Sequence, residues 1–448
     1  MIERGQKQCV GKDLDVGSPH LDVYCRAYAA GRGNYTSGYY CYQRGGTAAM
    51  FGLALSASRG LSGPIYRVDQ IPERFHEHYI LRGYRQPKSS LAQCLISIFD
   101  PTNETLNVWT HFLPTCYFVY LTFQLWGALD FEKDSYTWAL VCYLLVCCTF
   151  PLASAVAHLF NVMSDTARHV CFFLDYSALS LFSFGVAVAY RAYCFPSSLL
   201  LSKAPHLVWY CDNYVNVAAF NAVLSTFLTC ETRFLQPSPM HKAMRLGAFA
   251  IPYLYDSVPI IYRLLMPPPS SNNLSDQDQG AGISAAGEGY GPPLLLGGDH
   301  LHARQFLFTG VAAFLYATHL PERLLPGYFD IVGHSHQLFH VCGILAVLDQ
   351  MKAILLDFHH RRHFLEGLLK PSLTCDQDSD SPVFTFMNAF KRDAHASMCL
   401  TSDAVKVNSV MWDSELWENS LGYLIVIFWV IAVIAAFFTL RLFIQCKK

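Results

Sequence analysis

Four ionisable side chains lie inside apolar stretches of this chain, where such groups are costly and point to function. His158 lies in SAVAHLF and Asp175 in HVCFFLDYSAL, while His336 and His340 lie in GHSHQLFHV. Because His336 and His340 are four residues apart, both imidazoles lie on one face of an α-helix, about one turn apart. Imidazole pairs at this spacing recur in zinc sites. The pattern predicts a Zn2+ site held by His158, His336 and His340, with a fourth position open for water.

Two further residues are expected to support this site. Asp175 can hydrogen-bond either the metal-bound water or a ligating histidine. Ser154 precedes His158 by four residues, so it lies on the same helix face one turn away. One alternative stays open for each histidine taken alone: a histidine inside an apolar helix is often a buried residue bonded to a carbonyl or hydroxyl group.

Other polar residues in or next to apolar stretches allow two interpretations each. Glu104, Asn107 and His111 lie in NETLNVWTH. They form either a helix-start network, in which Glu104 favours the helix dipole, or a second polar layer beneath the metal. Asp256 lies between two prolines in an apolar stretch. It either contacts a ligand or serves as a buried hydrogen-bond partner.

The elements that must position these residues are membrane-spanning helices. The chain has 448 residues, 52% hydrophobic and 15% charged, whereas soluble domains carry about a quarter charged residues. A net charge of −2 without a basic stripe gives no indication of nucleic-acid binding. Eight apolar stretches are long enough to span a bilayer. They are Leu106–Leu129, Thr137–Val162, His169–Tyr190, Tyr214–Cys230, Ala243–Leu265, Gln305–Leu320, His336–Leu356 and Leu421–Ile444.

We therefore expect an all-α, polytopic membrane protein, in which a seven-helix transmembrane core at residues 105–358 is followed by an eighth, C-terminal transmembrane helix at 420–445. The remaining segments are polar. They are a disordered N-terminal extension at 1–64, an amphipathic juxtamembrane segment at 65–104, a long Pro/Gly/Ser loop at 266–301 and a polar loop at 359–419. The N-terminus lacks the apolar region of a cleavable signal peptide.

The distribution of Lys and Arg predicts a cytosolic N-terminus. The segment before the first span is basic, the loop after it is mostly acidic, and the loop after the fourth span carries Arg233, Lys242 and Arg245. The run His359–His363 disagrees, because it would lie outside, but later loops have less influence on topology. Its two arginines favour a solvated basic loop over a metal site.

This orientation brings all four intramembrane polar residues to one depth, near the cytosolic ends of spans two, three and seven. The spacing of His336 and His340 and the distribution of Lys and Arg are independent features of the sequence, and both favour a common site. The orientation also places the Asn273 sequon outside, where it is a glycosylation site. Cys194 and Cys211 share one outside loop and could form a disulfide.

Several motifs resemble the core motifs of the progestin and adipoQ receptor family. They are NETLNVWTH, SAVAHLF, RHVCFFLDY and THLPERLLPGYFDIVGHSHQLFH, and the resemblance extends from about Ile71 to Leu356. The stretches FHEHYILRGYRQP, PTNETLNVWTHFLP and FLDYSALSLFS resemble the membrane progestin receptor branch, closest to its gamma and delta members. The extension up to Pro64, the long loop after the fifth span and the polar stretch Pro371–Ser414 depart from the family pattern.

The resemblance implies a seven-helix core with a cytosolic N-terminus and a zinc ion held by the three histidines, with Asp175 and Ser154 nearby. It also implies a plasma-membrane receptor for progesterone-like steroids that signals rapidly and without transcription through a cytosolic partner. The alternative function is a zinc-dependent, ceramidase-like lipid amidohydrolase, because zinc-bound water can attack a lipid amide. The same ion could also only tie the helices together.

Overall fold

The computed structural model describes residues 23–27, 39–43, 59–200, 202–235, 238–266, 298–369 and 414–446. The Asn273 sequon and most of the two long predicted loops, 266–301 and 359–419, lie outside these residues. The chain divides into two units, Met1–Arg59 and Gly60–Lys448. In the first unit, β1 (Val23–Ala27) pairs antiparallel with β2 (Tyr39–Gln43). All the helices described below belong to the second unit.

Eight helices of 20 residues or more make up most of the described part of the second unit, one for each predicted span. They are α3 (Thr105–Trp126), α4 (Trp138–Phe160), α5 (Asp165–Ala189), α7 (Pro205–Glu231), α8 (Pro239–Leu265), α9 (Asp299–Thr318), α10 (Ser335–Leu369) and α13 (Ser414–Cys446). Among the described residues, four of these helices, α4, α5, α10 and α13, contain a span that is long and apolar enough to cross a membrane. The predicted fold class, an all-α polytopic membrane protein, is confirmed.

Local sequence explains where several of these helices begin. The side chain of Ser164 accepts a hydrogen bond from the backbone N–H of Ala167 and caps α5. Ser238 caps α8 in the same way, and Pro239 follows at the first helical position, where no backbone donor is needed. At its end, α5 continues as a π-helical turn, Tyr190–Cys194, whose residues pack in the core apart from Arg191.

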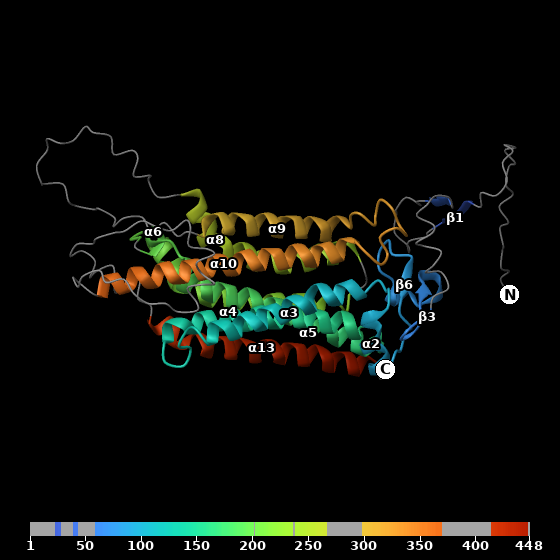
Figure 1. Cartoon of the computed structure of the whole chain (residues 1–448), viewed down its shortest axis with the longest axis horizontal. Coiled ribbons are helices and arrows are strands. Elements are labelled where there is room, and N and C mark those ends of the chain that lie inside the picture. The colour runs from blue at the N-terminus through green and yellow to red at the C-terminus, as the bar shows by residue number, and fades with distance from the viewer. Residues whose placement is uncertain are drawn as a thin grey trace, which may run out of the picture. The chain divides into compact units, whose positions relative to one another are not determined.

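Consecutive helices run in alternating directions along the bundle (Figure 1). The main packed pairs are α4 with α5, α3 with α4, α9 with α10, and α5 with α7, while α13 packs on α4, α5 and α7. The α4–α5 contact is close because Gly185 faces Val146; a Cβ atom at Gly185 would meet a Val146 methyl group at 2.5 Å. We call the end where α3, α5, α8 and α10 begin the site end, and the other the far end.

Short elements cover the site end ahead of α3. Strand β5 (Tyr66–Arg67) pairs antiparallel with β6 (Arg82–Tyr84), and helix α2 (Leu91–Ile96) follows. Between them, Ile71, Phe75, Ile80 and Tyr84 form a small apolar core of their own. The other short elements are β3 (Arg59–Gly60), β4 (Gly63–Pro64), η1 (Val68–Gln70), η2 (Glu73–Phe75), η3 (Ser97–Phe99), η4 (Ser135–Thr137) and α6 (Ser197–Leu200).

The expectation of a solvated basic loop after the seventh span was wrong for Arg361. Helix α10 continues through His359–His363 to Leu369, and Arg361 is only 1% exposed. Its guanidinium donates hydrogen bonds to the carbonyl oxygens of Ala192 at 2.9 Å and Phe195 at 2.5 Å. These carbonyls belong to the π-helical turn and its exit, so Arg361 satisfies backbone acceptors that the end of a helix leaves unpaired.

The disulfide that Cys194 and Cys211 could form in a shared loop is also not found. Both cysteines are free and buried, and neither lies in a loop. Cys194 ends the π-helical turn, and Cys211 lies in the second turn of α7, where its thiol donates to the carbonyl oxygen of Leu199 at 3.7 Å. The hydropathy pattern placed the helix ends too far apart here, which turned helical residues into an apparent loop.

Candidate metal centre

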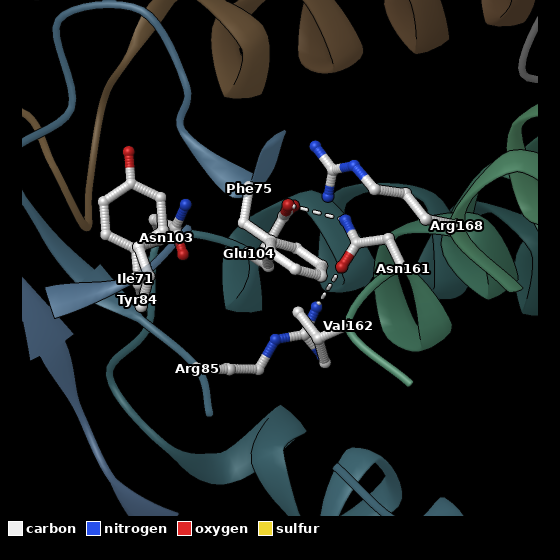
Figure 2. A pocket seen from close by; sticks show the side chains of 9 residues that line it. All are labelled: Ile71, Phe75, Tyr84, Arg85, Asn103, Glu104, Asn161, Val162 and Arg168. Atoms are coloured by element: carbon white, nitrogen blue, oxygen red, sulfur yellow. Dashed lines mark hydrogen bonds between the residues drawn. The ribbon is translucent and has the colours of Figure 1, made fainter. Parts of the chain in front are cut away.

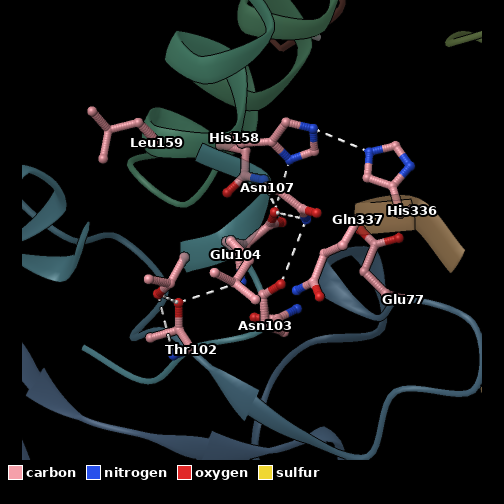
Figure 3. Close-up of polar contacts among 12 residues, drawn as sticks. Glu77, Thr102, Asn103, Glu104, Asn107, His158, Leu159, His336 and Gln337 are labelled. Atoms are coloured by element: carbon pink, nitrogen blue, oxygen red, sulfur yellow. Dashed lines mark hydrogen bonds and ion pairs between the residues drawn. The ribbon is translucent and has the colours of Figure 1, made fainter. Parts of the chain in front are cut away.

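Three histidines meet at the site end of the bundle. His158 lies in the last turn of α4, and His336 and His340 lie in the first two turns of α10. One ring nitrogen from each lies within 4.8 Å of the other two. The Nε2 atoms of His158 and His336 are 3.1 Å apart, as Figure 3 shows. The residues that the sequence predicted to converge from two separate spans therefore do so.

Hydrogen bonds on the outer side of two rings fix where their lone pairs point. His158 Nδ1 lies 2.8 Å from Glu104 Oε2, and a carboxylate oxygen only accepts, so this nitrogen carries the proton. His340 Nδ1 lies 3.1 Å from the hydroxyl of Thr110, which donates its own proton to the carbonyl of Leu106. Both Nε2 atoms are thereby left with lone pairs that can point into the cluster, as metal-ligating imidazoles require.

The donor set fits a zinc ion. Zinc binds imidazole nitrogen at about 2.0–2.1 Å, so two nitrogens on one tetrahedral ion are about 3.3 Å apart. The 3.1 Å separation of the His158 and His336 nitrogens is close to that value. His158 and His340 are 5% and 2% exposed, so competing water is largely excluded, whereas His336 is half-buried. A partly accessible third ligand suits a site with an open position.

Glu104 connects the candidate centre to the start of α3. Its carboxylate accepts from His158 Nδ1 and from Asn107 Nδ2 at 2.8 Å (Figure 3). It also accepts from Asn161 Nδ2 at 2.8 Å. The backbone N–H of Glu104 bonds the hydroxyl of Thr102, which belongs to a helix-start network. The two interpretations of NETLNVWTH therefore describe one structure, in which Glu104, the residue just before α3, belongs to the helix-start network and also orients His158.

His111 completes the same layer on the other side. Its ring stacks on His340 with centroids 3.8 Å apart and an interplanar angle of 11°. Its Nδ1 atom is buried and has no hydrogen-bond partner within the described ranges. The stacking leaves His340 little freedom to rotate, which favours a fixed ligand geometry.

Asp175 and Ser154 lie beside the histidines, as predicted. Ser154 hydrogen-bonds the Asp175 carboxylate, which in turn interacts electrostatically with His158. Asp256 lies about 25 Å along α8 from its first residue, well inside the bundle. There it accepts from the Ser183 hydroxyl at 2.5 Å and is 3% exposed. The structure thus makes Asp256 a buried acceptor for the half-buried Ser183, and its Oδ1 atom has no hydrogen-bond partner among the described residues.

Arg85, like Thr110 and Asn161, is a site residue that the sequence did not single out. It is 6% exposed and donates to the carbonyl oxygens of His158 at 2.6 Å and Leu159 at 2.7 Å. It also donates to Asn161 Oδ1 at 2.8 Å, and Asn161 bonds Glu104 (Figure 2). Burial lowers the pKa of Arg85, and the Glu104 carboxylate opposes that shift. Arg85 therefore holds the end of α4 in place directly behind a candidate ligand.

A small cavity lies on the outer side of this arginine. Its lining includes Arg85, Glu104 and Asn161, with Phe75 and Tyr84 from the short elements that cover the site end (Figure 2). Glu104 consequently has His158 on one side and this cavity on the other. The Glu104 carboxylate therefore contacts the candidate centre and also lines a cavity formed by the short elements ahead of α3.

The loop that leads into α10 is held as firmly. Glu322 is 2% exposed, and its carboxylate accepts from the Ser335 backbone N–H at 2.6 Å and from the Ser335 hydroxyl. Burial alone would raise the pKa of Glu322, but hydrogen bonds from His319 and Ser335 outweigh it and hold the pKa below its usual value. His334 Nε2 contacts the carbonyl of Asn103 at 3.1 Å. These bonds fix the residue that precedes His336.

A second group of metal-ligating side chains, at the far end, does not fit an ion. Cys194, His302 and Asp357 are buried and within 4.8 Å of one another. However, Gln305 Nε2 donates to His302 Nδ1 at 3.0 Å, so the proton lies on His302 Nε2, which faces Asp357 Oδ2 at 3.1 Å. Arg263 Nη1 donates to the same oxygen at 2.7 Å. With its nitrogen protonated and its carboxylate already paired, this group is an ion-pair network.

Replacing Glu104 with glutamine is expected to weaken zinc binding about 10–100-fold. The glutamine amide keeps the shape of the side chain, but its NH2 group faces at least one of the three donors whose hydrogen bonds Glu104 accepts. Loss of a hydrogen bond that orients a metal ligand typically weakens metal binding by this factor. Zinc affinity can be measured by chelator competition on the purified protein. Glu132→Gln, in an exposed position at the far end, is the matched control. Equal affinities for the two variants would show that Glu104 does not orient His158.

The chain matches one protein family and is similar to several named proteins. The Haemolysin-III related family matches residues 99–278 and 297–351. A human protein named membrane progestin receptor gamma is 45% identical over 309 residues, which is 68% of this chain and 85% of that protein. Human membrane progestin receptor delta is 44% identical over 303 residues, 67% and 81% of the two chains. Membrane progestin receptor alpha of Cynoscion nebulosus is 30% identical over 305 residues, 67% and 78%.

Proposed function

This chain belongs to the Haemolysin-III related family, and from that premise we propose that it is a membrane receptor for progestin steroids. The observation that carries the proposal is the 45% identity to a human protein named membrane progestin receptor gamma over 85% of that protein's length. The matched family residues include all three histidines, the whole of α4 and the first part of α10. The predicted resemblance to the gamma and delta members of the progestin receptor branch is confirmed.

We propose further that the site end faces the cytosol and that the receptor resides in the plasma membrane. Arg233 and Arg245 lie at the site end, and short segments rich in Lys and Arg remain on the cytosolic side. Helix α13 adds an eighth crossing, so the last described residues return to the same side as the start of α3.

We propose that His158, His336 and His340 hold a zinc ion near the steroid site. When bound, the ion supplies a Lewis acid that can polarise a carbonyl oxygen. Glu104 keeps the proton of His158 on Nδ1, and Thr110 does the same for His340. Arg85 hydrogen-bonds the backbone of His158 and lies in the segment ahead of α3. Through this contact, a change at the occupied site can reach the cytosolic surface, where a signalling partner binds and rapid signalling begins.

The hydrolase alternative is not favoured. The same donors would serve a lipid amidohydrolase, so the geometry of the histidines does not separate the two functions. This chain matches 85% and 81% of the length of two human relatives, and both of these proteins are named as receptors. Since a shared fold alone does not establish activity, the two functions must be separated by measurement.

The test is equilibrium binding of labelled progesterone to the purified full-length protein in lipid nanodiscs, with ceramide turnover measured on the same sample. We expect saturable binding that unlabelled progesterone displaces and cholesterol does not, because a hydrogen-bonding site rejects ligands that lack the matching polar groups. We expect no release of fatty acid from ceramide. Ceramide turnover without displaceable steroid binding would reverse the assignment.

A further inference from the structure

Three arginines gather on two stacked aromatic rings at the site end. Phe172 and Tyr176 of α5 stack with centroids 6.1 Å apart. The guanidinium carbon of Arg233 lies 4.5 Å from the centre of the Phe172 ring, and that of Arg168 lies 5.4 Å from the same ring. Arg245 lies 5.5 Å from the Tyr176 ring. We call Arg168, Arg233 and Arg245 the arginine cluster.

Two members of the arginine cluster have no carboxylate partner among the described residues. Arg245 Nε donates to the hydroxyl of Thr232 at 3.0 Å, which is a neutral acceptor. The Nε atom of Arg233 is buried and has no hydrogen-bond partner in the part of the chain that the structure describes. The carboxylates around them are already paired: Glu77 with Arg168, Asp165 with Arg74, and Glu231 with Arg441.

Within the described residues Arg168 pairs with Glu77, whereas Arg233 and Arg245 have no carboxylate paired with them. The three guanidinium groups are close enough for Arg168 and Arg245 to repel Arg233 electrostatically. Arg168 is also largely desolvated, with a side chain 11% exposed. Like charges held together out of water are unfavourable unless an anion joins them. A phosphate group suits this role, because planar guanidinium groups bind its oxygens with paired, charge-assisted hydrogen bonds.

The surroundings indicate that the anion is part of a lipid. The cluster is built from the first turn of α5, the α7–α8 connection and the second turn of α8. Large apolar side chains of the same two helices are exposed: Leu174 is 50% exposed, Met240 70% and Met244 43%. Arginines thus lie at the ends of helices whose neighbouring surface is apolar, as at sites where helix ends bind acidic lipid head groups.

We propose that Arg168, Arg233 and Arg245 form a binding site for the phosphate head group of an anionic phospholipid in the leaflet that meets the site end. The lipid phosphate supplies the negative charge that Arg233 and Arg245 lack. Its acyl chains lie along the apolar surface of α5 and α8. This site is separate from the three histidines and does not depend on progestin or zinc binding.

The test measures binding of short-chain phosphatidylinositol 4-phosphate to the full-length protein, purified in a neutral detergent. The variants are Arg233→Gln with Arg245→Gln, and Arg67→Gln as a matched control, because the Arg67 side chain is 71% exposed. We expect the double variant to bind the lipid roughly tenfold more weakly than wild type, and Arg67→Gln to bind like wild type. The pair Arg233→Lys with Arg245→Lys is expected to retain an intermediate affinity, because charge remains while paired hydrogen bonds are lost.

Two controls distinguish this proposal from general charge effects and misfolding. In lipid-free detergent the double glutamine variant is expected to unfold at a temperature no lower than wild type, because the change removes repulsion. Equal lipid affinity in the double variant and wild type, or an equal loss in Arg67→Gln, would overturn the proposal. Displacement of the lipid by an equal concentration of inorganic phosphate would also overturn it, because the occupant would then be free phosphate.

Discussion

Replacing Asp357 with alanine is expected to lower the free energy of unfolding by about 3–5 kcal/mol. The Asp357 side chain is fully buried, and its carboxylate accepts from Arg263 at 2.7 Å and from His302 at 3.1 Å. Without it, a buried guanidinium keeps its charge and loses its main counter-ion. The loss of stability is large because the cost of burying the Arg263 charge is no longer offset. This cost exceeds the net contribution of the lost hydrogen bond itself.

The measurement is equilibrium unfolding of the purified protein in detergent, followed by circular dichroism. Asp299→Ala is the matched control, because Asp299 pairs with the same Arg263 but its side chain is 42% exposed. For a half-solvated carboxylate we expect a loss of about 1 kcal/mol or less. Similar small losses in both variants would show that the far-end network does not hold α8, α9 and α10 together.

The helices and the meeting of the histidines could be predicted from sequence because both depend on simple periodicities. Apolar length determines a span, and spacing by four residues places His336 and His340 on one helix face. The alternation of spans then brings His158 to the same end. None of these steps needs the detailed packing of one helix on another.

The contacts around the histidines could not be predicted in this way. Arg85 and Glu104 bond His158 across 73 and 54 positions of the chain, and such pairs depend on how helix ends meet. From the sequence, Glu104 could belong either to a helix-start network or to a polar layer beneath the metal. Nothing in the local pattern around Arg85 distinguished it from the exposed basic residues of the same segment.

Arg361 shows the opposite error. A run of histidines and arginines is typical of a solvated loop, so the seventh helix was expected to end before it. The segment from Asp357 to Leu365 has no proline or glycine to stop a helix, and this signal could have extended α10. Burial of Arg361 depends on acceptors in a π-helical turn more than 160 positions earlier, which no local pattern reveals.

Replacing His340 with alanine is expected to weaken zinc binding more than about a hundredfold. The change removes one of three ligands, whereas losing a group behind a ligand already weakens binding about 10–100-fold. His340 is 2% exposed and lies between the ring of His111 and the other two histidines. His206→Ala is the matched control, because His206 is exposed at the far end of α7.

The zinc content of the purified wild-type protein, measured by elemental analysis beside these two variants, tests the metal centre most directly. We predict about one zinc ion per chain in wild type and in His206→Ala, and almost none in His340→Ala after the same wash with a weak chelator. Wild-type protein that is well folded, binds progesterone and contains no zinc after exposure to the metal would contradict the metal centre.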